Sequence, residues 1–170
     1  FFPNLWATVR HILRHRVELM LLDEFSDVRG VYRGKSYNYI KEGVLRDYGA
    51  AVQSIIDISK NFGIQPVLMT QPNRFTLEDN FTRIKYNEKI QPITYKDFCD
   101  LYSALNNLTR KLARKNRILV IDLDQKVQKN RSYMYDTIHL STEGNELVSN
   151  LIADSLVKSY PESFSKQLKD

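Results

Sequence analysis

The sequence predicts an α/β protein in which helices cover both faces of a parallel sheet. Two short apolar runs, residues 64–70 and 118–123, have the composition of buried strands. An amphipathic helix lies between them, and further helical patterns precede the first run and follow the second. A strand–helix–strand connection within one sheet is right-handed and makes its two strands parallel. We therefore expect a three-layer α/β/α arrangement.

The N-terminal part of the chain yields fewer firm elements. Asn4 is a candidate N-cap for a first helix, and the apolar run at residues 17–22 is compatible with a strand or a helix. Residues 23–41 are polar and aromatic, and a long connecting loop is expected there. His11 and His15 lie one helical turn apart among arginines. A metal pair or a phosphate-binding surface is compatible with this spacing, but no accompanying motif is found, so we expect a solvated basic face.

The elements before and within the crossover follow from local signals. A helix is expected over residues 44–61, with Gly63 ending it. Residues 71–96 show no strong period and form a second long loop, after which Thr94 or Asp97 caps the crossover helix. The cations near the end of that helix are expected to complement its dipole. They are Arg110, Lys111, Arg114 and Lys115.

Composition sets few limits on function. At 170 residues the chain is long enough for one domain with a hydrophobic core, and its 42% hydrophobic and 26% charged residues are ordinary for a globular protein. The net charge of +5 permits an acidic partner, but no nucleic-acid-binding motif accompanies it. We find no metal or cofactor motif and no apolar run near the ~18 residues of a membrane span. The single cysteine, Cys99, gives no indication of compartment.

One carboxylate and one imidazole lie three residues apart after the second strand. These are Asp136 and His139, and the last helix is expected to begin just beyond them, near Thr142. In a turn, residues at this spacing can point the same way, so the carboxylate can reach a ring nitrogen. That bond would fix the tautomer and leave the other nitrogen as a base. The alternative is a turn-capping aspartate beside an ordinary loop histidine, because this spacing also arises by chance.

Topology points to the same residues. In open parallel sheets, functional sites lie at the carboxyl ends of the strands. Residues 70–74 and 122–139 are the segments that leave those ends in the predicted sheet. We therefore expect the carboxylate–imidazole pair to lie where site chemistry occurs.

The sequence around the pair resembles the C-terminal block of the SGNH hydrolases, also called GDSL esterases and lipases. That block has the form D-x-x-H-L-[ST]-x-x-G-[NH], and residues 136–145 match it as DTIHLSTEGN. Residues 63–72 look like the family's fourth strand and the loop after it, and residues 101–109 look like its next helix. Residues 118–123 look like its fifth strand. The resemblance extends over residues 43–158.

The resemblance implies a flavodoxin-like fold of the SGNH type and ester hydrolysis by a serine nucleophile, with Asp136 and His139 catalytic and no cofactor. Family members also carry a G-D-S block with the serine and a G-x-N-D block that helps to build the oxyanion hole, and neither occurs here. Ser26 is the nearest match to the serine block, although its position favours a plain loop serine. Asn73 could mimic the oxyanion asparagine, and a loop asparagine beside proline is the alternative.

The strand count predicts an incomplete sheet. A parallel sheet covered on both faces has about five or six strands, whereas the sequence shows two firm ones. Because the strands are too few and the N-terminal blocks of the family are not found, we expect residues 1–170 to be a single domain that forms the C-terminal portion of a longer SGNH-type domain. A missing N-terminal segment or another chain would complete the sheet.

The expected function is an ester hydrolase to which this chain contributes the aspartate and histidine of the triad. The substrate would be a small-molecule or glycan ester carrying a carbohydrate or lipid acyl group. The alternative is a non-catalytic binding or interaction module with an SGNH-like fold. Nucleic acid is not an expected partner, and no membrane span is expected in this segment.

Overall fold

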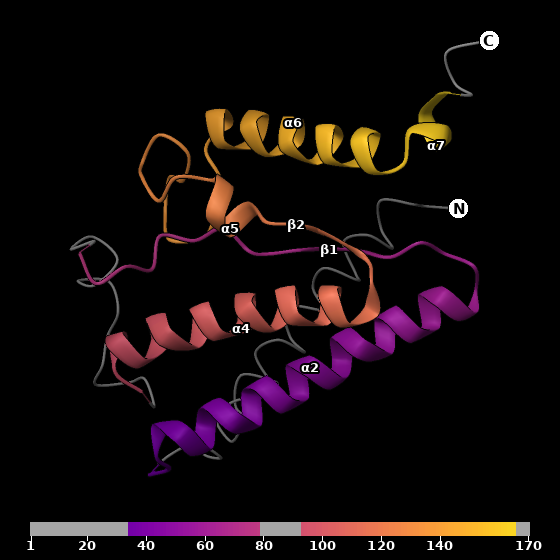
Figure 1. Cartoon of the computed structure of the whole chain (residues 1–170). Helices are drawn as coiled ribbons and strands as arrows, with labels where there is room; N and C mark the ends of the chain where they lie inside the picture. Colours follow the sequence, from indigo (N-terminus) through magenta and orange to yellow (C-terminus); the bar gives the residue numbers. More distant parts are fainter. Residues whose placement is uncertain (1–33, 79–92, 166–170) are drawn as a thin grey trace, which may run out of the picture. The chain divides into compact units, whose positions relative to one another are not determined.

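The computed structural model describes residues 34–78 and 93–165, and its helices and strands all lie in the unit Tyr37–Asp170 (Figure 1). The elements, in chain order, are α2 (Tyr37–Asn61), β1 (Val67–Met69), α4 (Tyr95–Asn116), β2 (Leu119–Ile121), α5 (Leu123–Lys126), α6 (Thr142–Ser159) and α7 (Pro161–Ser165). The described part is mixed α/β, mostly helical, with a two-stranded parallel sheet. The predicted helix at Asn4, the run at 17–22 and the His11–His15 pair lie outside the described residues.

Helix α2 begins at Tyr37 rather than at Val44, so the loop predicted over residues 23–41 is wrong for its last five residues. Contacts with α4 hold this first turn in helical form. The hydroxyl of Tyr37 and the ammonium group of Lys41 both donate to the carboxylate of Asp100, the ammonium at 2.7 Å. Because these contacts are polar and reach a distant helix, apolar periodicity could not reveal them.

The two strands pair in parallel, as predicted. Their register is Val67↔Leu119, Leu68↔Val120, Met69↔Ile121. Each strand has three residues, fewer than the apolar runs suggested. The amide of Ile64 donates to the carbonyl of Ser59 at 2.8 Å, and that of Ile118 donates to Ala113 at 3.1 Å. The ends of the runs therefore belong to helix-terminating turns, of which the first has Gly63 at φ +69°.

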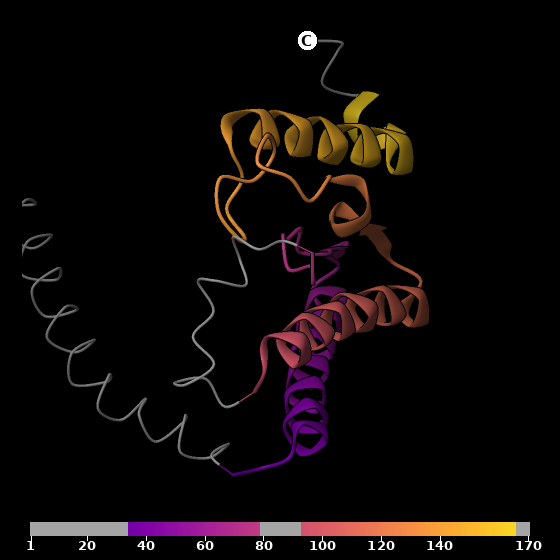
Figure 2. The same ribbon diagram turned by 90° about the vertical axis from the view of Figure 1, so that its left-hand side faces the viewer.

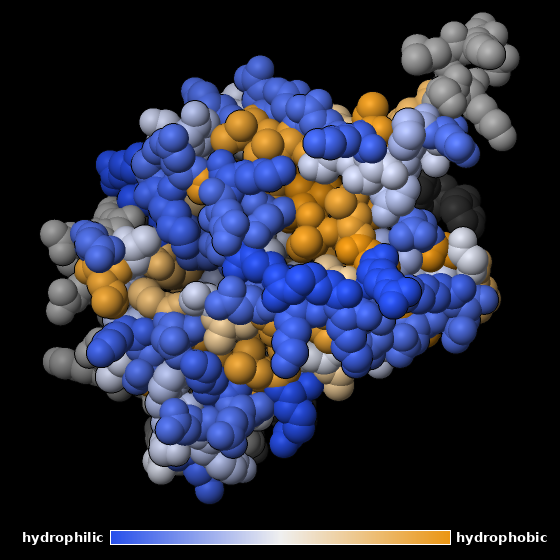
Figure 3. Space-filling model, in the orientation of Figure 1, coloured by the Kyte–Doolittle hydropathy of each residue, from blue (hydrophilic) through white to orange (hydrophobic). Residues whose placement is uncertain are grey.

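Helices lie on both sides of the strands. In two views, α6 is on one side and α4 on the other, and α2 packs against α4 (Figures 1 and 2). The buried cluster beneath α6 consists of Ile121, Leu123, Val127 and Val148. Apolar side chains also reach the surface between α6 and the strands (Figure 3). This core supports the chain that leaves β2 and turns back into α6.

Capping residues fix where the two helices next to the site begin. Thr94 is the N-cap of α4, and its hydroxyl accepts the N–H of Asp97 at 3.2 Å, so the first of the two predicted caps is correct. Ser141 caps α6, which starts at Thr142 as predicted. Side-chain oxygens thus satisfy helical N–H groups that have no partner within the helix.

None of the helices in the described part is both long enough and apolar enough to cross a lipid bilayer.

Candidate active site

Asp136 and His139 are hydrogen-bonded, as predicted. Oδ2 of Asp136 lies 2.7 Å from Nδ1 of His139. The other carboxylate oxygen accepts the backbone N–H groups of Ile138 at 2.9 Å and of His139 at 2.7 Å. The aspartate therefore closes a local turn with one oxygen and holds the ring with the other, which is why a spacing of three residues suffices to form the pair.

The carboxyl group of Asp136 is ionised at neutral pH. Desolvation raises its pKa, but the hydrogen bonds from the backbone and ring of His139 and from the backbone of Ile138 outweigh this effect. Together they lower the pKa from its ordinary value of 3.8 to about 2. An ionised carboxylate only accepts hydrogen bonds, so the proton of the shared bond resides on Nδ1. In the neutral ring, Nε2 then carries the lone pair that can take a proton.

The imidazole is accessible. The side chain of His139 is 61% exposed, whereas that of Asp136 is 30% exposed. Within residues 34–78 and 93–165, nothing hydrogen-bonds to Nε2. The ring of Tyr135 stacks on the imidazole, with 5.7 Å between the ring centroids and 14° between the planes. Stacking covers one face of the imidazole and leaves its edge open to a substrate.

The turn that carries the pair is closed at its base. Met134 and Leu140 form an antiparallel bridge, and the N–H of Ser141 donates to the carbonyl of Tyr133 at 3.0 Å. The side chain of Met134 is fully buried, and Leu140 packs against the core cluster beneath α6. The tip of the turn is therefore exposed, while its base is anchored in the core.

Helix α6 starts directly from this turn. The hydroxyl of Ser141 accepts the N–H of Gly144 at 3.0 Å and donates to the carbonyl of Ser132. A Cβ atom at Gly144 would lie 1.9 Å from the carbonyl oxygen of Tyr133. Only glycine lets the helix approach the turn this closely. These contacts give a physical reason for the serine and the glycine of the D-x-x-H-L-S-x-x-G pattern.

The turn that carries the pair contacts the segment that leaves the carboxyl end of β1, as the topology predicted. Thr70 follows the strand, and its N–H donates to the carbonyl of Ile121 at 3.2 Å. Further along, the N–H of Arg74 donates to the carbonyl of Thr137 at 2.9 Å. Thr137 lies between Asp136 and His139 in the sequence, so the chain leaving β1 contacts the turn directly.

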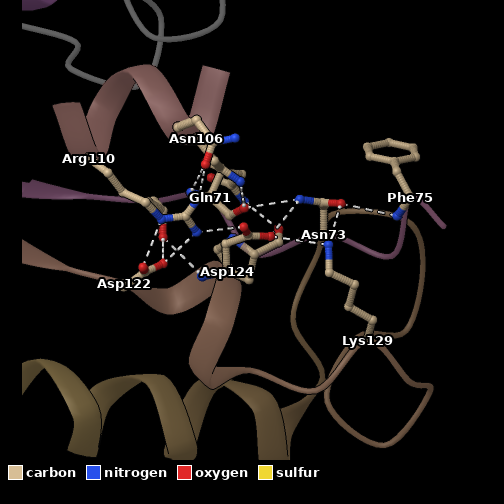
Figure 4. Close-up of polar contacts among 11 residues, drawn as sticks. Gln71, Asn73, Phe75, Asn106, Arg110, Asp122, Asp124 and Lys129 are labelled. Carbon is tan, nitrogen blue, oxygen red and sulfur yellow. Dashed lines mark hydrogen bonds and ion pairs between the residues drawn. The ribbon is translucent and has the colours of Figure 1, made fainter. Parts of the chain in front are cut away.

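A second polar cluster lies where the chain leaves the two strands (Figure 4). Nε and Nη2 of Arg110 on α4 donate to the carboxylate of Asp122 at 2.8 and 2.7 Å, and Nη2 also donates to Asp124 at 2.7 Å. The hydroxyl of Thr70 donates to Asp122 at 2.9 Å and accepts the N–H of Asp124 at 3.0 Å. Hydrogen bonding to Arg110 lowers the pKa of Asp122. The cluster therefore ties α4 to the residues that follow both strands.

Sequence reasoning missed this cluster. It assigned Arg110, together with Lys111, Arg114 and Lys115, to the dipole of the helix. Arg114 and Lys115 do lie in the last turn of α4, whereas Arg110 lies before it and pairs with Asp122 and Asp124. The one available signal was the pair of carboxylates, Asp122 and Asp124, directly after an apolar strand. Carboxylates at that position need a cation when they are partly buried.

Asn73 has no amide hydrogen left for an oxyanion. Its Nδ2 donates to the carbonyl of Gln71 at 3.2 Å and to Asp124 at 3.3 Å, and its Oδ1 accepts the N–H of Phe75 at 3.1 Å (Figure 4). The side chain is 3% exposed. The residue therefore acts as the loop asparagine of the alternative interpretation. Ser26, the candidate nucleophile, lies outside the described residues.

The arrangement provides a base and its orienting carboxylate. In the described part of the chain, no three or more His, Cys, Asp and Glu side chains are grouped to hold a metal ion. No protein-family model matches the sequence, and no curated protein matches it either. The resemblance to the SGNH hydrolases therefore depends on the residues of the turn and on the order of the elements around it.

Proposed function

We propose that the protein is an ester hydrolase of the SGNH type, in which Asp136 and His139 form the aspartate–histidine part of a serine triad. The observation that carries this proposal is that the imidazole of His139 is oriented by a carboxylate and is still accessible. A carboxylate holds Nδ1 at 2.7 Å, and the ring is largely exposed on a turn that contacts the segment leaving a parallel strand. The same carboxylate–imidazole geometry serves acyl transfer on several unrelated folds.

In the proposed reaction, Nε2 of His139 takes the proton of a serine hydroxyl as its oxygen attacks the ester carbonyl. The alcohol leaves with that proton, and the acyl group stays on the serine. Nε2 then takes a proton from water as the water oxygen attacks the acyl-serine, and it returns that proton to the serine oxygen when the carbonyl–serine bond breaks and the acid is released. Asp136 holds the Nδ1 proton throughout and stabilises the imidazolium in each step. Its pKa of about 2 keeps it ionised at neutral pH.

We propose that the serine and the oxyanion donors come from residues outside the described ranges or from another chain. The hydroxyl of Ser141 is engaged in capping α6 and in a bond to Ser132, so it is not a candidate. The amide group of Asn73 is engaged as well. Within this sequence, Ser26 is the candidate that the resemblance brings forward.

Exposed apolar side chains support a larger sheet around the site. In the described part of the chain, β1 pairs with β2 alone, and an isolated two-stranded sheet is marginally stable in water. Ile55 and Ile58 on α2 are 61% and 58% exposed, Phe62 directly after the helix is 78% exposed, and Met69 on β1 is 50% exposed. We propose that a missing N-terminal segment or another chain completes a three-layer α/β/α sheet of the SGNH type.

The proposed substrate is a carbohydrate or lipid acyl ester. Tyr135 is 61% exposed beside His139. The ring of Phe75, one residue beyond Arg74, lies 4.8 Å from that of Phe98 and 4.6 Å from that of Tyr102. Aromatic faces bind both sugar rings and acyl chains. Comparing an acetylated sugar with p-nitrophenyl esters of increasing chain length would separate the two classes.

The test of the proposal is hydrolysis of p-nitrophenyl acetate by three samples: the complete gene product, its His139→Ala variant and the 170-residue chain. Glu146→Ala, an exposed change on α6, serves as the matched control. We expect activity in the complete product, its loss in His139→Ala, and little or none in the 170-residue chain. Activity of that chain abolished by Ser26→Ala would instead make Ser26 the nucleophile. Inactivity of the complete product toward several acyl esters, unchanged by His139→Ala, would favour the binding module.

A further inference from the structure

We propose that Arg74 is a positioning residue that sets the location of the Asp136–His139 pair; this inference rests on the proposed function. Its backbone N–H donates to the carbonyl of Thr137 at 2.9 Å, and Nη1 of its guanidinium group donates to the carbonyl of Met134 at 3.3 Å. These two acceptors lie on either side of Asp136 in the sequence. One residue therefore holds both sides of the turn.

Arg74 is itself held firmly. It is 5% exposed. The preceding residue, Asn73, fixes the chain around it, because its side chain accepts the N–H of Phe75 and donates to Asp124. Asp124 is ion-paired with Arg110 of α4 at 2.7 Å (Figure 4). A continuous series of polar contacts thus runs from α4, through the segment after β1, to the turn that carries the pair.

The contribution of Arg74 is to the location of the pair rather than to its formation. The bonds between Asp136 and His139 join residues three apart and need no distant partner. The guanidinium bond to Met134 instead joins the turn to the chain that leaves β1. Without it, the pair should remain bonded but shift relative to the strand ends. A misplacement of about 1 Å can lower a rate by about 10²-fold.

The test compares Arg74→Met, Arg74→Lys and Arg114→Met in the complete gene product. Arg114 is exposed on α4, so Arg114→Met controls for the loss of one arginine. The first measurement is hydrogen exchange of the backbone amide of residue 74, which each variant retains. We expect exchange in Arg74→Met to be faster by about tenfold or more, as for the loss of a bond from a charged donor. Arg114→Met should match the unmodified protein.

The second measurement is the separate effect on kcat and KM for ester hydrolysis. In Arg74→Met we expect kcat to fall by about 10²-fold with KM changed less than about twofold, because orientation and not binding is lost. The ammonium group of Arg74→Lys can reach one carbonyl but is less rigid than the guanidinium group. In both measurements this variant should therefore lie between Arg74→Met and the unmodified protein. A purely structural role would not separate kcat from KM in this way.

Unchanged exchange at residue 74 in Arg74→Met would overturn the inference, and so would a rise in KM with kcat preserved. If Arg74→Met fails to fold, Arg74→Lys decides, and wild-type exchange and kcat in that variant would contradict a positioning role. If the complete gene product hydrolyses no ester, the proposed function fails on its own. Faster exchange at residue 74 in Arg74→Met would then still show that the Arg74 side chain holds the turn in place. Failure of the proposed function can therefore be distinguished from failure of the positioning role.

Discussion

The turn at Asp136–His139 and the cluster around Arg110 lie at the same end of the sheet but are built in opposite ways. The bonds of the pair join residues three apart, and its side chains are 30% and 61% exposed. The cluster joins Arg110 to Asp122 and Asp124 across two elements, with the arginine only 12% exposed. In the turn a ring nitrogen is open to react, whereas in the cluster the charges are engaged with one another.

This difference suggests that the turn serves the chemistry and the cluster around Arg110 serves the stability of the fold. A change of the exposed imidazole should alter activity while leaving the free energy of unfolding almost untouched. A change in the buried cluster should do the reverse, because an unpaired charge there loses its solvation without compensation.

The largest effect is expected for His139→Ala in the complete gene product. Because the general base is lost, kcat/KM for p-nitrophenyl acetate should fall by about 10³-fold or more. The free energy of unfolding should change by less than about 0.5 kcal/mol, since the side chain is exposed. Enzyme assays measure the change in kcat/KM, and urea unfolding measures the change in stability. A large loss of stability with activity intact would reverse the roles assigned to the two regions.

Arg110→Met should be the most destabilising single change. It leaves the partly buried Asp122 without a cation and Asp124 with Lys129 alone, which should cost about 3–5 kcal/mol of unfolding free energy. Urea unfolding of the 170-residue chain measures this, with the exposed change Arg114→Met as control. A loss below about 1 kcal/mol would mean that the cluster is solvated like a surface ion pair.

Gly144→Ala should destabilise the junction between the turn and α6. The new Cβ would meet the carbonyl oxygen of Tyr133 at 1.9 Å, so the helix must shift, at a cost of about 1–3 kcal/mol despite the better helix propensity of alanine. Gly43→Ala on α2, where nothing lies within 4 Å of the added atom, is the matched control. That change should be stabilising by about 0.5–1 kcal/mol. Equal changes in the free energy of unfolding for Gly144→Ala and Gly43→Ala would contradict the close approach of Gly144 to the carbonyl of Tyr133.

The smallest effect is a pH dependence carried by Asp136. Its pKa in the folded protein is lowered from 3.8 to about 2, so its ionised form stabilises the fold above its unfolded pKa. That contribution is lost as the pH falls through the folded value. Asp136→Asn should therefore lose less stability than the unmodified protein between about pH 5 and about pH 2. Urea midpoints at the two pH values test this, with the exposed change Asp154→Asn as control. Identical pH profiles for Asp136→Asn and the unmodified protein would contradict it.

Local signals explain what could be predicted from the sequence. The Asp136–His139 bond, the Thr94 cap and the start of α6 each depend on residues within a few positions of one another. The parallel pairing of β1 and β2 follows from the length of the helix between them, together with the handedness of crossovers. These features were therefore predictable before any distant contact was known.

Features that depend on distant partners were not predictable. The first turn of α2 is held by Asp100, which lies 63 residues after Tyr37. The cluster joins Thr70 to Asp122, which are 52 residues apart. Arg110 looked like one of several cations near a helix end, and nothing in its neighbourhood marked it as buried. Periodicity and capping rules carry no information about such pairings.

The most direct test of the central claim is covalent labelling of the complete gene product with a fluorophosphonate, followed by peptide mapping. The reagent reacts with a serine whose proton a neighbouring base removes. We expect one labelled serine, outside residues 34–78 and 93–165, and loss of that label in His139→Ala with Glu146→Ala unaffected. Absence of a labelled serine, or labelling that persists in His139→Ala, would contradict the assignment of Asp136 and His139 to a serine esterase.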